Sequence, residues 1–180
     1  MTFEPAGLDG AWLLDLERHE DERGFFARAW CGSEFASRSL SGTLAQCSLS
    51  YNRKARTIRG MHYQAAPSEE AKVVRCIRGA IYDVLLDLRP ASPTYTRWIA
   101  RELTADNRLA FYVPEGVAHG FQTLTDDTEV LYLIDETYDP ALARGVRWND
   151  PNFDIHWPEA PGLMSERDRS YPDVATEPRP

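Results

Sequence analysis

Two of the four histidines in the chain stand where they could take part in a reaction. His62 lies inside the strand-like stretch RTIRGMHYQ, and His119 follows the turn in PEGVAHGF, where it leads into the next strand. An imidazole titrates near neutral pH and also binds metals, so each is a candidate general base, metal ligand or packed core residue. His19, in the polar run LERHEDERG, is expected to be solvated, and His156, in FDIHWP, is expected to be structural.

The spacing around these histidines argues against a metal. Metal-binding cupins, which are double-stranded β-barrels, use the pattern P-x-G-x-x-H for one ligand and an H-x-H…E cluster for the others. In this chain Gln64 occupies the position of the second histidine of that cluster. A catalytic metal needs at least three good ligands, so we expect no metal and no other cofactor.

A lysine shifts the balance from packed histidines toward acid–base chemistry. Lys72, in EEAKVVRC, heads an apolar strand. A strand-borne ammonium that points into a barrel is costly unless it meets an anion or a developing oxyanion. Together with His62 and His119, it indicates a site in which negative charge forms on a substrate.

The elements that would carry these side chains are almost all strands. Short apolar runs at a spacing of roughly ten residues, separated by turn-forming residues, predict an antiparallel sandwich or barrel. The runs 71–79 and 80–90 meet at Gly79 and are predicted to form a hairpin. The second run alternates, which predicts one face more apolar than the other. Further strands are predicted at 97–105, 108–114, 120–125 and 129–138.

Helix is expected only at the periphery. One short helix is predicted at residues 33–40, which Ser33 could cap. The tail from Trp157 is rich in proline and charge and is expected to wrap the surface, with about eight loose residues at its end. Neither a repeat nor a low-complexity linker interrupts the chain, so we expect residues 1–180 to form a single domain.

Composition excludes several classes of protein. The formal net charge of −8 argues against a nucleic-acid or membrane binder, because such partners need a basic surface. Cys31, Cys47 and Cys76 are odd in number and lack C-x-x-C spacing, which favours reduced thiols in a cytoplasmic protein. The N-terminus does not resemble a signal peptide, and every apolar stretch falls short of the roughly 20 residues of a membrane span.

Several motifs in order resemble the dTDP-4-dehydrorhamnose 3,5-epimerases. They are DERGFF, RGMHYQ, KVVRCIRGAIYDVLLDLR, VPEGVAHGF, EVLYLIDETY, RGVRWNDP and SERDR, and they run from about residue 10 to residue 172. The resemblance implies an all-β, cupin-type jelly roll (a double-stranded β-helix) with short peripheral helices. It also implies a homodimer that needs no metal and a nucleoside-diphosphate 4-keto-6-deoxy sugar as substrate.

The resemblance also implies roles for individual residues. His62 would be the catalytic base and Asp168 its orienting partner, Lys72 would face the C4 carbonyl, and Tyr132 would be the opposing acid. The substrate would be bound by Arg23 and Arg59 at the diphosphate, by Tyr138 at the nucleoside end, and by Phe26, Arg28, Gln64 and His119. Arg23, Arg59 and Lys72 are expected in one pocket. Considered alone, Tyr132 could instead be a core residue, Asp168 a solvated charge and Arg59 a surface residue.

These roles make chemical sense for an enolising enzyme. Removing the proton beside a ketone creates an enolate whose charge lies mainly on the oxygen, where a cation stabilises it. Histidine has a suitable pKa for the base, and a carboxylate can fix its tautomer. Inversion requires a donor on the other face, and tyrosine can serve as that acid. Arginine pairs two diphosphate oxygens at once.

The chain departs from the family at a few positions. Arg28 stands where a glutamate is usual near the nucleobase, Ser48 where an asparagine is usual, Leu133 where a lysine is usual and Thr137 where an aromatic is usual. A different nucleobase, a shifted substrate, or epimerisation at only one carbon therefore stays open. So do two other functions, namely a 3,4-ketoisomerase on the same scaffold and a non-catalytic cupin that binds a nucleotide sugar.

Overall fold

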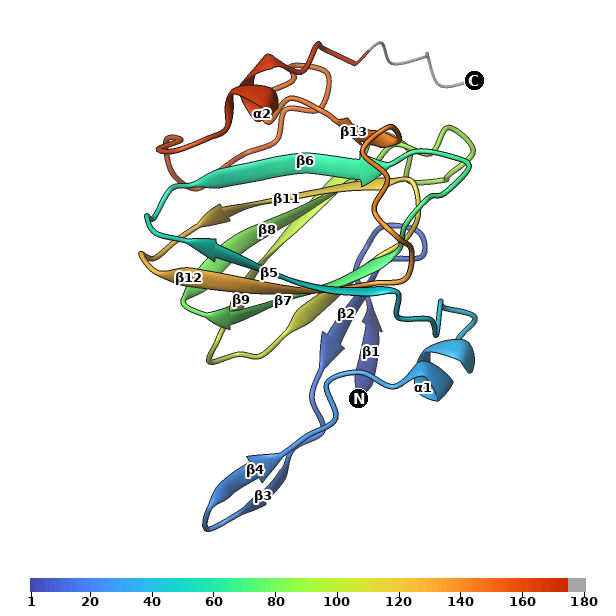
Figure 1. Cartoon of the computed structure of the whole chain (residues 1–180), viewed down its shortest axis with the longest axis vertical. Helices are drawn as coiled ribbons and strands as arrows, with labels where there is room; N and C mark the ends of the chain where they lie inside the picture. The colour runs from blue at the N-terminus through green and yellow to red at the C-terminus, as the bar shows by residue number, and fades with distance from the viewer. Residues whose placement is uncertain (175–180) are drawn as a thin grey trace.

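Two antiparallel sheets lie face to face and form most of the molecule (Figure 1). The structure is a computed structural model and describes residues 1–174. The six-stranded sheet has the order β1 (Thr2–Pro5), β2 (Trp12–Asp15), β10 (Ala110–Val113), β7 (Lys72–Arg78), β12 (Thr128–Ile134) and β5 (Gln46–Asn52). The five-stranded sheet has the order β13 (Ala143–Gly145), β6 (Ile58–Gln64), β11 (Val117–Thr123), β8 (Ala80–Asp87) and β9 (Trp98–Thr104). The predicted all-β jelly roll is confirmed.

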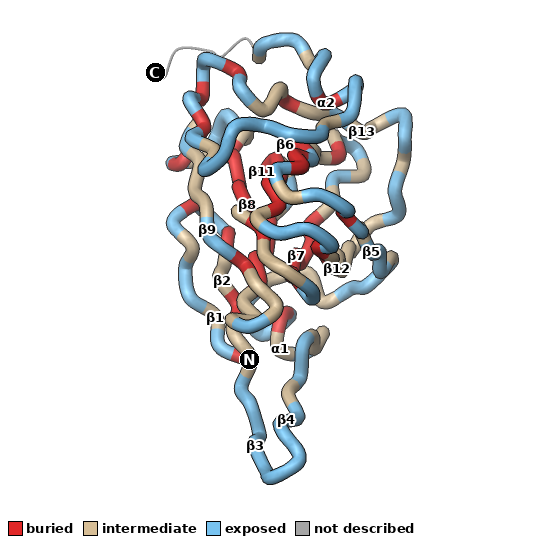
Figure 2. Tube along the Cα trace, turned by 90° about the vertical axis from the view of Figure 1, so that its left-hand side faces the viewer, coloured by how far each residue is buried: buried red, intermediate tan, exposed pale blue. Residues whose placement is uncertain are grey.

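The main hydrophobic core fills the space between the two sheets. Val74 and Phe111 reach it from the six-stranded sheet, and Leu85, Leu103 and Phe121 reach it from the five-stranded sheet. Successive side chains of a strand point to opposite faces, so each strand gives alternate residues to this core. In Figure 2 the buried positions follow β7, β8 and β11 through the centre of the molecule.

The predicted hairpin at residues 71–90 is wrong. Strands β7 and β8 flank Gly79 as expected, but β7 pairs with β10 and β12 whereas β8 pairs with β9 and β11. Gly79, with a φ of +76°, therefore turns the chain from one sheet into the other. A turn signal marks where a strand ends, but it does not determine which strand becomes its neighbour.

Strand β8 is buried on both faces, and the face of Val84 and Leu86 is the more apolar, in line with the predicted alternation. Leu85 faces the core between the sheets, whereas Val84 packs against a second cluster that includes Phe153 from the C-terminal segment. Asp83 and Asp87 are fully buried and, by the two-residue period of a strand, lie on the same face as Leu85. Two carboxylates therefore stand inside the sandwich.

Helix α1 (Gly32–Ala36) is shorter than the predicted helix at 33–40. Cys31 occupies its N-cap position without a side-chain hydrogen bond, so the expectation that Ser33 caps the helix is wrong. The Ser33 hydroxyl lies 3.2 Å from the sulfur of Cys31 instead. Phe35, the buried residue of this helix, packs against Phe3 and Trp30 at the six-stranded sheet.

The C-terminal tail wraps the surface, as predicted, and it contains a second helix that was not predicted. Helix α2 (Glu166–Ser170) lies over β6 (Figure 1), and the Ser165 side chain caps it by accepting a hydrogen bond from the backbone N–H of Asp168. Of the last eight residues, Asp173 pairs with Arg147, and Val174 bonds through its backbone to Asp150 and Asn152. The rest of the segment predicted to be loose, residues 175–180, lies outside the described residues.

A two-stranded hairpin projects from the body of the molecule. Strands β3 (His19–Asp21) and β4 (Gly24–Phe26) pair only with each other, and every residue of both strands is exposed (Figures 1 and 2). Phe26 is 74% exposed. Within residues 1–174, no helix is both long enough and apolar enough to cross a membrane.

Candidate active site

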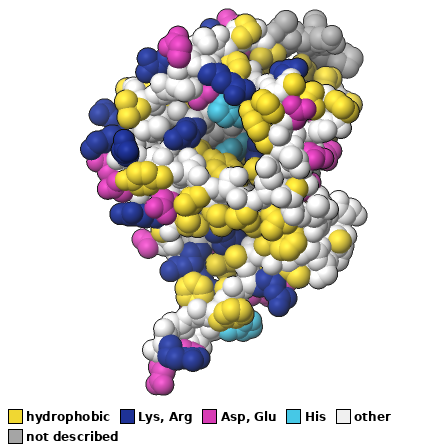
Figure 3. All heavy atoms as spheres, in the orientation of Figure 1, with side chains coloured by type: hydrophobic (Ala, Val, Ile, Leu, Met, Phe, Trp, Pro, Cys, Tyr) yellow, Lys and Arg dark blue, Asp and Glu magenta, His cyan; other side chains and the backbone are white. Residues whose placement is uncertain are grey.

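A cavity of about 540 Å³ opens between the two sheets. Its walls come from β6 and β11 of one sheet and from β5, β7 and β12 of the other, and they carry most of the candidate residues. In Figure 3 histidine side chains lie at the bottom of a hollow that is flanked by lysine and arginine side chains. The candidates in its lining are Arg59, His62, Gln64, Lys72, His119, Tyr132 and Tyr138. An adjoining cavity of about 550 Å³ shares Arg59, His62 and Arg167 with it.

An irregularity in β6 brings Arg59 and His62 to the same cavity. Residues three apart in a regular strand point to opposite faces, yet both of these side chains line the cavity. The pairing of β6 with β11 shifts register at this point, which has the effect of a β-bulge. Gly60 has a φ of +116°, and a Cβ there would lie 2.5 Å from Gly120. Only glycine fits this close approach.

His62 is paired with Asp168, which lies 106 positions away in the sequence. The Nε2 atom of His62 and the Oδ1 atom of Asp168 are 2.6 Å apart. Burial alone would raise the pKa of Asp168, but hydrogen bonds from His62, Ser165 and the backbone of Gly60 lower it overall. Asp168 is thus a buried, ionised carboxylate that fixes the imidazole ring, and Nδ1 of His62 is the ring nitrogen left to accept a proton.

Lys72 and Tyr132 reach the cavity from the opposite sheet. Lys72 is only 6% exposed, and its Nζ lies 2.6 Å from Oε1 of Glu70. Burial raises the pKa of Tyr132 far above its usual value, and the Asp83 carboxylate raises it further, whereas Arg59 lowers it. The phenol therefore keeps its proton at neutral pH and can act as an acid.

His119 lies beside His62 in the paired strand and has its own carboxylate. Its Nε2 is 2.7 Å from Oδ1 of Asp83, and its ring meets the Tyr132 ring edge-on at 5.9 Å. The other carboxylate oxygen of Asp83 is buried without a partner among the described residues. Burial raises the pKa of Asp83, while His119 and Lys72 lower it. Each of the two histidines in the cavity lining is thus paired with a buried aspartate behind it.

Two further side chains shape the ends of the cavity. The Nε atom of Arg59 donates to Asn52, 2.6 Å away, and Asn52 is itself held by backbone and hydroxyl oxygens of β5 and β12. Gln64 is buried, and its amide bonds to backbone groups of Ser68, Thr137 and Asp139. Gln64 therefore clamps the loop after β12.

Four of the candidates do not line this cavity, and one of the four, Asp168, lines the adjoining cavity instead. Arg23 is 85% exposed at its side chain and pairs with Asp21, while Phe26 ends the projecting hairpin. Arg28 follows that hairpin and lies 3.7 Å from Glu34. The expectation that Arg23 shares a pocket with Arg59 and Lys72 is therefore not met within one chain. The hairpin carries Arg23 and Phe26 away from the sandwich (Figure 1).

Asp83, Asn52 and Glu70 are candidate functional residues that the sequence patterns did not single out. Asp83 had one usable signal, an acid inside a strand that is apolar at most other positions. No local sequence pattern indicates that Asn52 contacts Arg59 or that Glu70 contacts Lys72. Among residues 1–174, no group of three or more His, Cys, Asp or Glu side chains could hold a metal ion. What this geometry can perform is proton transfer beside a polarised carbonyl.

Comparison with known proteins places these features in one family. A family model described as dTDP-4-dehydrorhamnose 3,5-epimerase matches residues 5–176. The dTDP-4-dehydrorhamnose 3,5-epimerase of Sinorhizobium fredii is 35% identical over 99% of this chain and 92% of its own length. The dTDP-4-dehydrorhamnose 3-epimerase of Streptomyces niveus is 40% identical over 94% of this chain and 82% of its own. The crystal structure of the 3,5-epimerase of Bacillus anthracis with TDP and PPi bound has a TM-score of 0.92 at 37% identity, covering 96% and 99% of the two chains.

Proposed function

Since the chain belongs to the dTDP-4-dehydrorhamnose 3,5-epimerase family, it is a sugar epimerase, and we propose that it inverts C3, C5 or both of a nucleoside-diphosphate 4-keto-6-deoxy hexose in deoxysugar biosynthesis. One observation supports this most strongly. His62 and Tyr132 approach a single cavity from opposite sheets, and Lys72 lines the same cavity. Inversion beside a carbonyl requires a base on one face of the carbon, an acid on the other face and a cation near the carbonyl oxygen.

The first step is removal of a proton by His62. With Nε2 held by Asp168, Nδ1 takes the proton from the carbon beside the C4 carbonyl, and Asp168 stabilises the imidazolium that forms. The electron pair of the broken C–H bond moves to the C4 oxygen. The Lys72 ammonium donates to that oxygen as negative charge develops, which is worth roughly 3–4 kcal/mol in comparable sites.

The second step returns a proton to the opposite face of the carbon. Tyr132 belongs to β12 of the six-stranded sheet, whereas His62 belongs to β6 of the five-stranded sheet. Because the pKa of Tyr132 is raised, its phenol is protonated when the enolate forms. Donation to the other face gives the inverted centre and restores the carbonyl.

The diphosphate is bound by arginines at the edge of the cavity. Arg59 is fixed by Asn52, and Arg167 borders both cavities. Guanidinium groups pair well with diphosphate oxygens. Tyr138, 51% exposed beside the cavity, offers a ring to the nucleoside end.

A homodimer would explain the place of the remaining candidates. Arg23, Phe26 and Arg28 can contact a substrate only in the cavity of a second copy, because their hairpin projects away from its own sandwich. Exposed Leu49 and Tyr51 on β5 provide apolar surface for such a copy. The free cysteines at 31, 47 and 76 are consistent with the reducing cytoplasm as the location of the enzyme.

Isotope exchange tests the proposed function and the site of inversion. The protein is incubated in heavy water with dTDP-, GDP- and CDP-linked 4-keto-6-deoxy sugars, and deuterium is located by mass spectrometry. Label at C3, at C5 or at both identifies the inverted carbons. A His62→Ala variant should lose exchange while it still binds nucleoside diphosphate. Wild-type protein that binds these sugars without exchange would favour the binding-cupin alternative, and a C3 ketone product would favour the ketoisomerase.

The nucleobase is a separate question. Arg28 stands where an acceptor is usual, and an arginine suits a base with more acceptors than thymine, such as guanine or cytosine. We therefore propose a preference for GDP or CDP over dTDP, measured by calorimetry. A clear preference for dTDP would contradict it.

A further inference from the structure

A buried ion pair at the cavity wall involves a residue that the reaction above does not use. The Nζ of Lys72 lies 2.6 Å from Oε1 of Glu70, and the two side chains are 6% and 11% exposed. Both line the cavity. An ammonium buried to this extent is stabilised by a partner that carries the opposite charge.

The charge of Glu70 is unusual for this cavity. Among the described residues of its lining, Glu70 is the one carboxylate, and it faces the cations Arg59, Lys72, Arg144 and Arg167. An acid in a cavity that receives a diphosphate repels the ligand unless the acid is neutralised by a neighbour. The short contact with Lys72 provides that neutralisation and explains why an acid is tolerated there.

The pair also restricts a side chain that is otherwise flexible. Lys72 begins β7, where it pairs with Val113 of β10 and Ile134 of β12, so its backbone is fixed by both neighbours. The four-carbon stem of lysine still leaves the ammonium many positions. A second contact is needed to hold it, and Glu70, two residues earlier, supplies one.

We infer that Glu70 is a positioning residue for the epimerase reaction: its carboxylate holds the Lys72 ammonium at the cavity wall so that the remaining N–H groups face the C4 oxygen of the substrate. This inference rests on the proposed function. It concerns the geometry of the cation rather than the binding of the nucleotide. A misplaced cation stabilises the enolate poorly even when the substrate binds normally.

A double-mutant cycle tests the inference. In heavy water, Glu70→Ala should lower the initial rate of deuterium exchange by about 30-fold, while the dissociation constant for dTDP or the preferred nucleoside diphosphate changes by less than about twofold. In a Lys72→Met background the same substitution should have no further effect on exchange, because the group it positions is gone. Glu70→Gln, which keeps a neutral acceptor, should lose only about fivefold.

The matched control is Glu69→Gln, a substitution at an exposed neighbour in the same loop that lies outside the cavity lining. It should leave exchange unchanged. Full exchange in Glu70→Ala, or an equal fall with and without Lys72, would overturn the inference, since the second result means a general structural role. If Glu70→Ala fails to fold, Glu70→Gln completes the cycle. Wild-type protein without exchange overturns the proposed function and this inference with it.

Discussion

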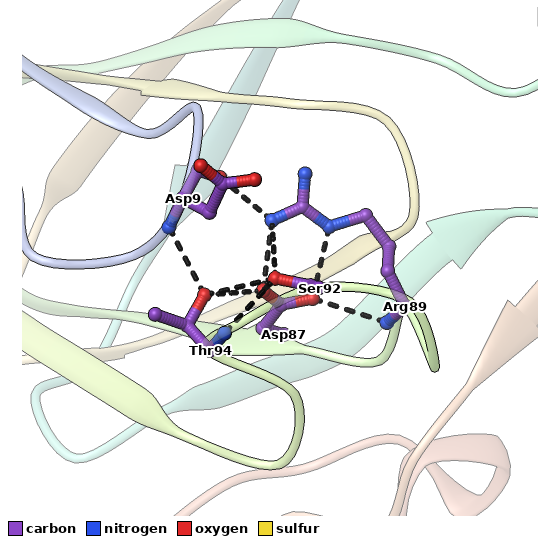
Figure 4. Close-up of polar contacts among 5 residues, drawn as sticks. All are labelled: Asp9, Asp87, Arg89, Ser92 and Thr94. Carbon is purple, nitrogen blue, oxygen red and sulfur yellow. Dashed lines mark hydrogen bonds and ion pairs between the residues drawn. The ribbon is translucent and has the colours of Figure 1, made fainter.

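Asp83 and Asp87 lie four residues apart on β8, both fully buried, yet their surroundings are opposite. Asp87 receives hydrogen bonds from the backbone N–H and the guanidinium of Arg89 and from the hydroxyls of Ser92 and Thr94 (Figure 4). Asp83 has one partner, His119, and one oxygen without any partner among the described residues.

The pKa values of the two acids follow from this difference. Burial disfavours the charge of each. At Asp87 the donors outweigh burial and lower its pKa, whereas at Asp83 the single histidine and the charge of Lys72 do not, and its pKa is raised. Burial alone therefore does not determine whether a buried acid is charged; the number of hydrogen-bond donors around it does. Asp87 fixes the loop after β8, whereas Asp83 supports His119, whose side chain lines the cavity.

Among the cavity residues, a substitution of His62 should have the largest effect on activity. His62→Asn removes the proposed base without creating a large void, so isotope exchange should fall by about 10⁴-fold. The melting temperature should stay within a few degrees of the wild type, because the ring is only half-buried. Deuterium exchange in heavy water measures the loss of activity, and differential scanning calorimetry measures the melting temperature. A large loss of stability would mean that the cavity, like the Asp87 cluster, holds the fold together.

The reverse outcome is expected at Asp87. Asp87→Ala leaves the half-buried guanidinium of Arg89 and the buried hydroxyl of Thr94 without their acceptor and should cost about 3–5 kcal/mol of unfolding free energy, measured with urea. Exchange per folded molecule should not change. Asp9→Ala is the control, because Asp9 joins this cluster through its backbone alone (Figure 4) and should remain near wild type.

The two acids should also respond to pH with opposite signs. Because the pKa of Asp87 lies below 3.8 in the folded state, the stability it contributes is present above pH 3.8 and is lost as the pH falls below it. Because the pKa of Asp83 lies above 3.8, its charge costs stability once the pH rises through its raised value. The stability advantage of wild type over Asp87→Asn should therefore shrink in acid, whereas that over Asp83→Asn should grow. Urea titrations from pH 3 to 7 would contradict this if both differences moved in the same direction.

The smallest effect should come from Asn52, which holds Arg59. Asn52→Ala leaves the arginine in place but mobile, so affinity for nucleoside diphosphate should fall by about tenfold with kcat nearly unchanged. Asn149→Ala is a matched control, since Asn149 makes the same kind of bond to Arg147 outside the cavity lining. An equal loss of affinity in both variants would show that the Asn52 contact has no special role.

Local patterns predicted the strands well and their neighbours poorly. Alternation and turn residues marked β7 and β8, but the pairing of each with distant strands depends on contacts that no short window contains. For the same reason the inner position of Asp83 was not recognised. An acid in an alternating strand looks solvent-facing until the C-terminal segment is known to cover the other face.

Motifs in order connected residues that are far apart in the sequence, which local patterns could not do. His62, Lys72, His119 and Tyr132 line one cavity, although they are spread over some 70 positions of the sequence. Asp168 reaches the ring of His62 from helix α2, which was not predicted although Ser165 caps it. The order of the motifs could not show that Arg23 and Phe26 lie on a hairpin outside the cavity. A motif does not indicate whether its residues line the cavity of their own chain or that of another copy.

The sandwich itself sets the distance between His62 and Tyr132. The proposed base belongs to one sheet and the proposed acid to the other, and the two sheets are held apart by a hydrophobic core that includes Val74, Phe111 and Phe121. Stacked sheets keep a separation of about 10 Å. Larger or smaller side chains in this core would change the distance between His62 and Tyr132 without altering either residue. The volume of the hydrophobic core would then influence the stereochemistry of the product.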